Sequence, residues 1–281
     1  MASLSILVPL DGSSTAERAL PLANVLATAY GAQIRLLHVA GEAEGVKKPD
    51  DVTEAGSRFA SYANEAVARA GVTAPIAAVE TVPGKAADAI LEAVGDARMI
   101  AIATHGRGGF KAAFIGSVAD KVLHGAHVPV AVVSGAEGPV ELGNGPVLVT
   151  LDGSEESERA LPVARELARL LDRKVVLVRG FTLLPPVTLD VAYYPPNYVD
   201  ELEESARAYL QSMAESGEEI LLVNGPPAEA ITDAANRLDA SLTVMESGGK
   251  GLARRIALGS TTDRVVHMLR RPILIVPPPA S

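Results

Sequence analysis

The segment LVPLDGSSTAERALPLANVLA, Leu7–Ala27, is the clearest guide to the architecture, because it returns later in the chain as LVTLDGSEESERALPVARELA, Leu148–Ala168. About two-thirds of the aligned positions are identical. A second pair of segments recurs in the same order, with GSVADKVLHGAHVPVAVV at Gly116–Val133 and GSTTDRVVHMLRRPILIV at Gly259–Val276. A repeat period near half of the chain length predicts two copies of one domain rather than a solenoid of short repeats.

The segment between the copies, SGAEGPVELGNGP at Ser134–Pro146, is rich in Gly and Pro and has no apolar periodicity. Such a composition is typical of a linker. We therefore expect one domain over residues 1–138 and a second over residues 144–281.

Within each copy, short β-branched runs alternate with helical patterns. The expected strands are 5–9, 33–39, 76–82, 99–104 and 128–133 in the first copy, and 147–150, 175–179, 219–223, 242–245 and 273–276 in the second. The helices expected in the first copy are 14–30, 52–70, 86–94 and 116–124. This alternation predicts an α/β fold in which each copy forms a doubly wound parallel sheet of five strands with right-handed crossovers.

The composition of the 281 residues excludes several classes of protein. Hydrophobic residues make up 48% and charged residues 21%, as in a globular chain. The net charge of −9 is poorly matched to a nucleic-acid backbone, and the absence of Cys excludes disulfides and thiolate metal sites. The sequence contains neither a signal-peptide pattern nor an apolar run long enough to span a bilayer, so we expect a cytoplasmic protein without a membrane partner.

The first candidate for ligand binding is the acidic residue after the first strand of each copy, Asp11 and Asp152. Open α/β sheets bind ligands beyond the carboxyl ends of their strands, and a carboxylate there can accept hydrogen bonds from a ribose or an adenine amino group. A structural alternative is that Asp-Gly forms the turn and that Ser14 with Glu17 forms a capping box for the following helix.

The second candidate is the Gly-rich segment after the fourth strand, ATHGRGG at residues 103–109, followed by Gly116 and Ser117. Glycines let backbone N–H groups approach phosphate oxygens, and a helix N-terminus favours an anion. The alternative is that Ser117 with Asp120 caps the helix, as Ser260 with Asp263 would in the second copy. The two roles are compatible, because both act on the same N–H groups.

Together these segments resemble the universal stress protein family over nearly all of both copies. ATP-binding members of that family carry Gly-x2-Gly-x9-Gly-(Ser/Thr) after strand four and an Asp after strand one. The first copy has Gly106, the nine-residue spacer, Gly116 and Ser117, with Ala103 in place of the first glycine. Alanine still allows a close backbone approach where φ is negative.

The resemblance implies an adenine nucleotide alpha hydrolase-like fold with strand order 3-2-1-4-5, in which strands one and four meet at the topological switch point. It also implies ATP, with or without Mg²⁺, as the ligand. The residues that it assigns to the ligand in the first copy are Pro9, Asp11, Val39, Ile102, Ala103, His105, Gly106, Arg107, Gly109, Gly116, Ser117 and Val118.

The second copy departs from this motif, because Glu246 replaces the first glycine, Gly248 replaces the His and Thr150 replaces the Pro. A carboxylate beside a triphosphate repels it unless it is paired, for which Lys250 and Arg254 are candidates. We expect tight ATP binding in the first copy and weak or no binding in the second. The remaining candidate contacts of the second copy are Asp152, Gly249, Gly259, Ser260 and Thr261.

Three classes of function remain open. The motifs favour a nucleotide-responsive binding protein of the stress response, because they supply nucleotide contacts without an obvious group to activate water. A slow ATPase or nucleotidyl transferase using His105 or Asp11 is the enzymatic alternative. A nucleotide-free dimerisation protein is the third, if Ala103 and Glu246 block both sites.

Two further features concern assembly and the histidines. The last strands of the copies, 128–133 and 273–276, are apolar sheet edges that invite pairing, so we expect the two copies to form an intrachain pseudo-dimer. A homodimer of the whole chain is a further expectation. His124 and His267 each follow an Asp by four residues near a helix end, which favours pairing within the helix over a metal site.

Overall fold

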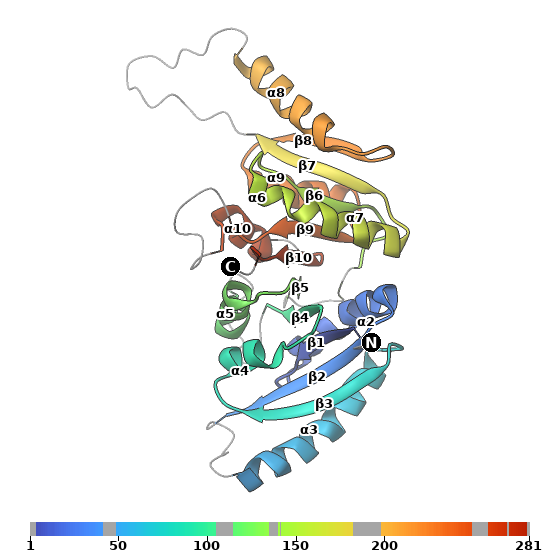
Figure 1. Cartoon of the computed structure of the whole chain (residues 1–281), viewed down its shortest axis with the longest axis vertical. Helices are drawn as coiled ribbons and strands as arrows, with labels where there is room; N and C mark the ends of the chain where they lie inside the picture. The colour runs from blue at the N-terminus through green and yellow to red at the C-terminus, as the bar shows by residue number, and fades with distance from the viewer. Residues whose placement is uncertain are drawn as a thin grey trace, which may run out of the picture.

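A computed structural model describes residues 4–41, 49–104, 115–134, 140, 142–181, 198–248, 258–268 and 270–279. Its strands form one ten-stranded sheet with the order β3-β2-β1-β4-β5-β10-β9-β6-β7-β8. We call the part that contains β1–β5 domain one and the part that contains β6–β10 domain two. The two domains follow each other along the long axis of the molecule (Figure 1).

The elements have the following bounds. Domain one contains β1 (Ser5–Pro9), α1 (Ser14–Glu17), α2 (Ala19–Tyr30), β2 (Gln33–Ala40), α3 (Pro49–Arg69), β3 (Ile76–Pro83), α4 (Ala86–Ala93), β4 (Met99–Ala103), α5 (Ser117–Gly125) and β5 (Val130–Val133). Domain two contains β6 (Val147–Thr150), α6 (Glu155–Glu158), α7 (Ala160–Leu171), β7 (Val175–Phe181), α8 (Tyr198–Met213), β8 (Glu219–Asn224), α9 (Pro227–Arg237), β9 (Leu242–Glu246), α10 (Ser260–Met268) and β10 (Ile273–Val276).

Each domain has the strand order 3-2-1-4-5 with parallel neighbours, which confirms the predicted fold class. The expected helix over 14–30 is interrupted at Arg18, between α1 and α2. The reason is Pro21, which has no N–H to donate to the carbonyl of Glu17 four residues earlier. Pro162 produces the same break between α6 and α7.

The two domains join through their last strands. β5 and β10 pair antiparallel, with Val132 opposite Ile273 and Val130 opposite Ile275. This pairing confirms the predicted intrachain pseudo-dimer. It also removes two apolar sheet edges from solvent, so the two five-stranded sheets become one continuous sheet.

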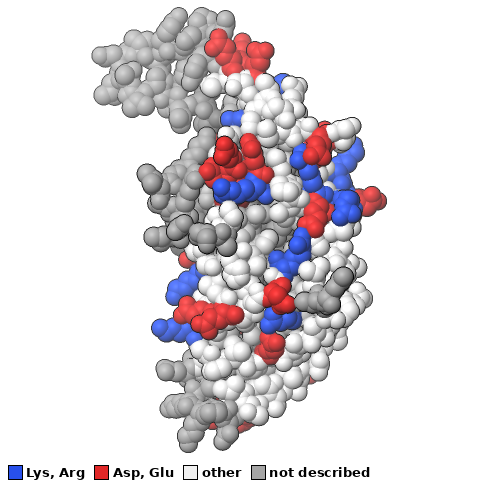
Figure 2. All heavy atoms as spheres, in the orientation of Figure 1, with Lys and Arg blue, Asp and Glu red and all other residues white. Residues whose placement is uncertain are grey.

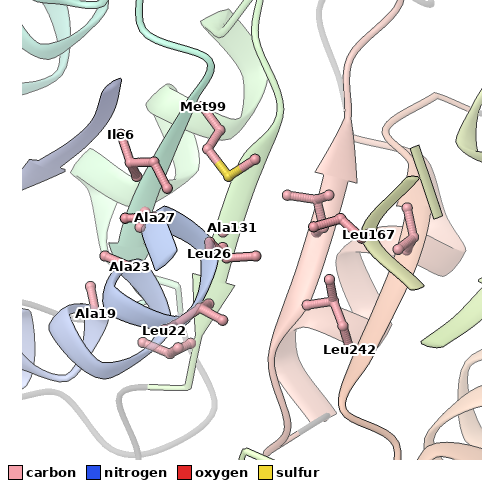
Figure 3. Close-up of a cluster of buried hydrophobic side chains, with 14 of the residues drawn as sticks. Ile6, Ala19, Leu22, Ala23, Leu26, Ala27, Met99, Ala131, Leu167 and Leu242 are labelled. Atoms are coloured by element: carbon pink, nitrogen blue, oxygen red, sulfur yellow. The ribbon is translucent and has the colours of Figure 1, made fainter. Parts of the chain in front are cut away.

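The helices cover both faces of the sheet. One face is packed by α2, α3, α7 and α8 and the other by α4, α5, α9 and α10. On the first face the small side chains of α2 lie against Ile6 and Met99, and the same cluster continues across the domain junction to Leu167 and Leu242 (Figure 3). Alanine on the buried side of α2 lets the helix lie close to the strands.

Polar contacts also cross the domain junction. Arg98 of domain one forms an ion pair with Glu166 of domain two, and the hydroxyl of Tyr30 donates to the same carboxylate at 3.2 Å. The Arg98 guanidinium lies 4.5 Å from the centre of the Tyr30 ring.

The linker is held against domain two just before β6. Gly145 N donates to the carbonyl of Asp239 at 2.7 Å, and a Cβ at Gly145 would lie 2.0 Å from the carbonyl oxygen of Leu238. Asn144 N donates to the Asp239 carboxylate at 2.8 Å, and this bond lowers the pKa of Asp239 below its ordinary value. The glycine expected from linker composition therefore serves a close backbone contact.

None of the helices in the described ranges is both long and apolar enough to cross a bilayer. On the face shown in Figure 2, acidic and basic side chains lie interspersed over both domains.

Candidate functional site

The candidate site of domain one lies where β1 and β4 end. β1 lies between β2 and β4 and is parallel to both, with Pro9 opposite Leu37 and Leu7 opposite Ile100. The chain leaves β1 toward β2 on one side and returns to β4 on the other, so the two strands form the topological switch point. The structure thus places Pro9, Ile102 and Ala103 at two adjacent strand ends, with Val39 near the end of β2.

Asp11 lies in a fixed turn directly after β1. Its Oδ1 accepts hydrogen bonds from Ser13 N at 2.9 Å and from the Ser13 hydroxyl at 2.6 Å. Gly12 makes the turn with φ of 82°, a conformation that favours glycine. The carboxylate is therefore oriented before any ligand arrives.

The capping box predicted at this turn is wrong. The N-cap of α1 is Ser13, whose hydroxyl accepts from Ala16 N at 3.1 Å, and Glu17 instead pairs with Arg69 at 2.9 Å. Ser13 has the extended conformation that an N-cap requires, whereas Ser14 is already helical.

His38 is a further residue at this end of the sheet, and the sequence reasoning missed it. The buried ring stacks on Phe59 with centroids 4.9 Å apart, and its Nδ1 lies 3.0 Å from the carbonyl oxygen of Leu10. Because that carbonyl precedes Asp11, His38 helps to fix the turn. The available signal was a histidine inside the otherwise apolar end of a strand, next to Val39.

The N-terminus of α5 lies beside the end of β4. Gly116 N donates to the carbonyl of Thr104 at 2.5 Å, and Thr104 N donates to Val133 O at 3.0 Å. Ser117 and Val118 begin the helix from this point. The structure therefore brings Gly116, Ser117 and Val118 to the same edge as Asp11.

The predicted capping of α5 by Ser117 with Asp120 is also wrong. Gly116 is the N-cap, with φ −63° and ψ 144°, and within the described ranges it forms no side-chain cap. Ser117 is already helical, so it does not fill the N-cap position. Its predicted contact with a ligand stays a prediction.

Domain two repeats this backbone arrangement. Asp152 Oδ1 accepts from Ser154 N at 2.9 Å, and Gly259 N donates to Ser247 O at 2.8 Å, as Gly116 does to Thr104. Thr150 ends β6, and Ser260 with Thr261 begins α10. The candidate residues that lie outside the described residues are His105, Gly106, Arg107, Gly109 and Gly249.

Each half of the sheet has an acidic turn after its first strand and a helix that begins at Gly-Ser. We therefore compared the chain with known protein families. Residues 4–134 and residues 143–277 each match the sequence model described as "Universal stress protein family". The chain belongs to the universal stress protein family. It is a tandem member, with one match in each half.

Individual relatives agree with this assignment. The chain is 32% identical over 133 residues to a universal stress protein of Thermus aquaticus, an alignment that covers 46% of this chain and 96% of that protein. It is 29% identical over 200 residues to a universal stress protein of Mycolicibacterium smegmatis, covering 67% of this chain and 65% of the relative.

A solved structure shows the same two-domain fold. The crystal structure of a universal stress protein from Archaeoglobus fulgidus superimposes with a TM-score of 0.70 at 21% identity and covers 99% of both chains. At this identity the likeness concerns the fold alone.

In this tandem universal stress protein, Glu246 is the main departure of domain two. It is the last residue of β9, and its side chain is only 3% exposed. Its Oε2 accepts from Gly248 N at 2.7 Å, and its Oε1 lies 4.0 Å from an Arg159 guanidinium nitrogen. The carboxylate therefore bonds a backbone N–H of the loop that the family motif assigns to phosphate.

Arg159 was not among the expected partners of Glu246. Lys250 and Arg254, which the sequence suggested, lie outside the described residues. The sequence signal for Arg159 is that an arginine recurs at this position of both copies, as Arg18 and Arg159. In domain one, Arg18 also reaches the end of the sheet, where it donates to Ser134 O at 2.9 Å.

A second difference lies at the position of His38, which Arg179 occupies in domain two. The Arg179 guanidinium lies 4.8 Å from the centre of the Tyr209 ring and 3.0 Å from the point where a Cβ on Gly153 would lie. Domain two thus has a permanent cation beside its Asp152 turn, where domain one has an imidazole.

The two C-terminal histidines of α5 and α10 contact their own helices. His124 Nδ1 lies 2.7 Å from Asp120 O, and His267 Nδ1 lies 2.7 Å from Asp263 O. Each ring also lies near the carboxylate of the same aspartate, at 3.4 and 3.7 Å. The predicted pairing of each histidine with the Asp four residues earlier is confirmed. In both cases the imidazole lies closer to the backbone carbonyl of that Asp than to its carboxylate.

Proposed function

We propose that domain one binds ATP and that the protein acts as a nucleotide-responsive regulator in the stress response. The adenosine contacts Asp11 and Val39, and the phosphates contact the loop after β4 together with Gly116 and Ser117. Binding changes the conformation or the choice of partner rather than turning over the nucleotide.

The observation that supports this proposal most is the meeting of two features at one sheet edge. The Asp11 carboxylate is held by two hydrogen bonds from Ser13, and the N-terminus of α5 is tied to Thr104 at the end of the adjacent strand. A hydrogen-bond acceptor suits a ribose or adenine, and a helix N-terminus suits a phosphate. A nucleotide is a ligand with both groups.

Domain two, on the same proposal, binds ATP more weakly than domain one. Its backbone offers the same edge, but the Glu246 carboxylate already accepts the Gly248 N–H. A phosphate would have to displace that bond and approach a second negative charge. Arg159 at 4.0 Å compensates part of this charge.

Isolation without added ligand tests the proposal. Mass spectrometry of the purified full chain should detect an adenine nucleotide, and calorimetry of the nucleotide-free protein with ATP should show one tight binding event. Protein that carries no nucleotide and shows no heat with ATP would instead support the nucleotide-free dimerisation protein.

The enzymatic alternative has its own measurement. Release of inorganic phosphate from bound ATP over hours, abolished by His105→Ala, would identify a slow ATPase. Unchanged ATP over the same period supports a binding protein.

A further inference from the structure

His124 of domain one reaches across the domain junction. It lies in the last turn of α5, and its Nε2 accepts a hydrogen bond from Leu258 N of domain two at 2.8 Å. α5 and α10 lie on the same side of the sheet next to the β5–β10 junction (Figure 1). The bond therefore links an α-helix of one domain to the segment that leads into an α-helix of the other.

The two contacts of the ring define its proton. The carbonyl of Asp120 can only accept, so Nδ1 at 2.7 Å carries the hydrogen. Leu258 N–H can only donate, so Nε2 is the unprotonated nitrogen. His124 is therefore the neutral imidazole with both nitrogens in use, and its side chain is only 26% exposed.

Leu258 directly precedes the Gly-Ser start of α10. The next residue, Gly259, donates its N–H to Ser247 O at 2.8 Å, and the helix begins at Ser260. Leu258 itself belongs to the buried cluster on this face of the sheet. Two successive N–H groups are thus fixed, one by Ser247 directly after β9 in the same domain and one by His124 of the other domain.

The hydrogen bond between His124 and Leu258 N has no counterpart in the described ranges between the equivalent residues, His267 and Ile115. His267 is the repeat counterpart of His124 and bonds Asp263 O in the same way. In the described parts of the chain, however, Ile115 N, the counterpart of Leu258 N, forms no hydrogen bond to His267. Among the described residues, the imidazole of domain one thus accepts from the backbone of domain two, and the reverse bond is not formed.

We propose that His124 is a positioning residue for the ligand site of domain two, which is complete only when domain one supplies this imidazole. The inference rests on the proposed function for the identity of the ligand, but the positioning itself is a property of the ligand-free protein. The hydrogen bond connects α5 of domain one to the residue that directly precedes Gly259 of domain two.

The first test needs no ligand. Amide hydrogen exchange at Leu258 is compared in the full chain for wild type, His124→Leu, His124→Gln and His267→Leu. Loss of the acceptor in His124→Leu should speed exchange at Leu258 about tenfold, the effect of one lost hydrogen bond. His124→Gln, whose amide oxygen can accept in place of Nε2, should restore most of the protection, and His267→Leu should leave it unchanged.

A further variant guards against unfolding in His124→Leu. His124→Asn keeps a polar amide but is too short to reach Leu258, so it should behave like His124→Leu while remaining folded. Equal exchange at Leu258 in wild type, His124→Leu and His124→Asn would overturn the proposal.

The second test concerns the ligand site and uses Glu246→Gly protein, in which domain two lacks the competing carboxylate. Adding His124→Leu should weaken the domain-two binding event for ATP about three- to tenfold and leave the domain-one event unchanged. Equal domain-two affinity with and without His124 would overturn the role in the site. Absence of any ATP binding would overturn the proposed function instead, while the exchange result would still decide the positioning.

Discussion

The carboxyl ends of the two half-sheets share a backbone but differ in charge. In domain one, Ala103 ends β4 and a buried His38 supports the acidic turn. In domain two, Glu246 ends β9 and Arg179 lies beside the corresponding turn. The two copies thus share the scaffold but differ at two places on this edge, where Ala103 and His38 of domain one correspond to the carboxylate of Glu246 and the guanidinium of Arg179 in domain two.

The backbone contacts show how little the scaffold depends on those side chains. Thr104 N donates to Val133 O at 3.0 Å in domain one, and Ser247 N donates to Val276 O at 2.9 Å in domain two. These bonds join the fourth strand to the fifth in both halves whether the last strand residue is Ala or Glu. The difference therefore leaves the fold unchanged. We expect it to affect ligand binding, and the following variants test this expectation.

Asp11→Ala should have the largest effect. Loss of a charge-assisted contact should weaken ATP binding by about 1.5–3 kcal/mol, measured by calorimetry on the nucleotide-free protein. The matched variant Asp152→Ala removes the same carboxylate from domain two and should leave the tight event unchanged. Unchanged affinity in Asp11→Ala would remove Asp11 from the site.

Ala103→Glu transfers the carboxylate of domain two into domain one. Repulsion between this carboxylate and a phosphate should weaken the tight event by on the order of 1 kcal/mol or more. Ala103→Gln is the control, because it has nearly the same size without the charge. Equal losses in the two variants would mean that volume, not charge, is responsible.

Glu246→Gly makes the opposite change in domain two. Removal of the carboxylate frees the Gly248 N–H and should strengthen domain-two binding by about 1 kcal/mol, a smaller effect because Arg159 already offsets part of the charge. The measurement is the second binding event in a calorimetric titration. A wild-type protein with two equivalent tight sites would contradict the comparison.

The two tyrosines packed beside the acidic turns offer the smallest test. Tyr209 donates to Glu158 at 3.0 Å. The buried hydroxyl of Tyr62, its counterpart, forms no hydrogen bond of standard geometry among the described residues, although burial and the nearby Glu17 carboxylate raise its pKa. Tyr209→Phe should lower the free energy of unfolding by about 1 kcal/mol, and Tyr62→Phe should lower it by less, because the contact of Tyr62 with Glu17 is longer than a standard hydrogen bond. Denaturant unfolding of both variants measures this difference.

The tyrosine pair also has a pH signature. Burial, followed by the bond to Glu158, raises the pKa of Tyr209 to about 12. Because the folded state holds this proton more tightly than the unfolded state, the contribution of Tyr209 is complete below about pH 10 and is lost as the pH rises toward about 12. The gap between wild type and Tyr209→Phe should therefore narrow over that range. A gap that stays constant would contradict the assignment.

Much of the fold was accessible from local patterns. The repeat of Leu7–Ala27 as Leu148–Ala168 indicates two domains, and strand–helix alternation indicates a parallel sheet. The apolar edges of β5 and β10 predict their pairing, which the structure confirms. The capping predictions failed because the position of an N-cap depends on the exact residue at which the backbone becomes helical, as at Ser13 and Gly116.

The duplication, the class of fold, the acidic turn after the first strand and the unusual Glu246 can all be recognised from the sequence alone, because each depends on residues that are close in the chain. The three-dimensional structure was needed to find that Arg159 is a cation near Glu246 and that His124 accepts from Leu258. These contacts join residues far apart in sequence. They depend on which elements become neighbours and on where each side chain points, and neither is encoded in spacing or periodicity.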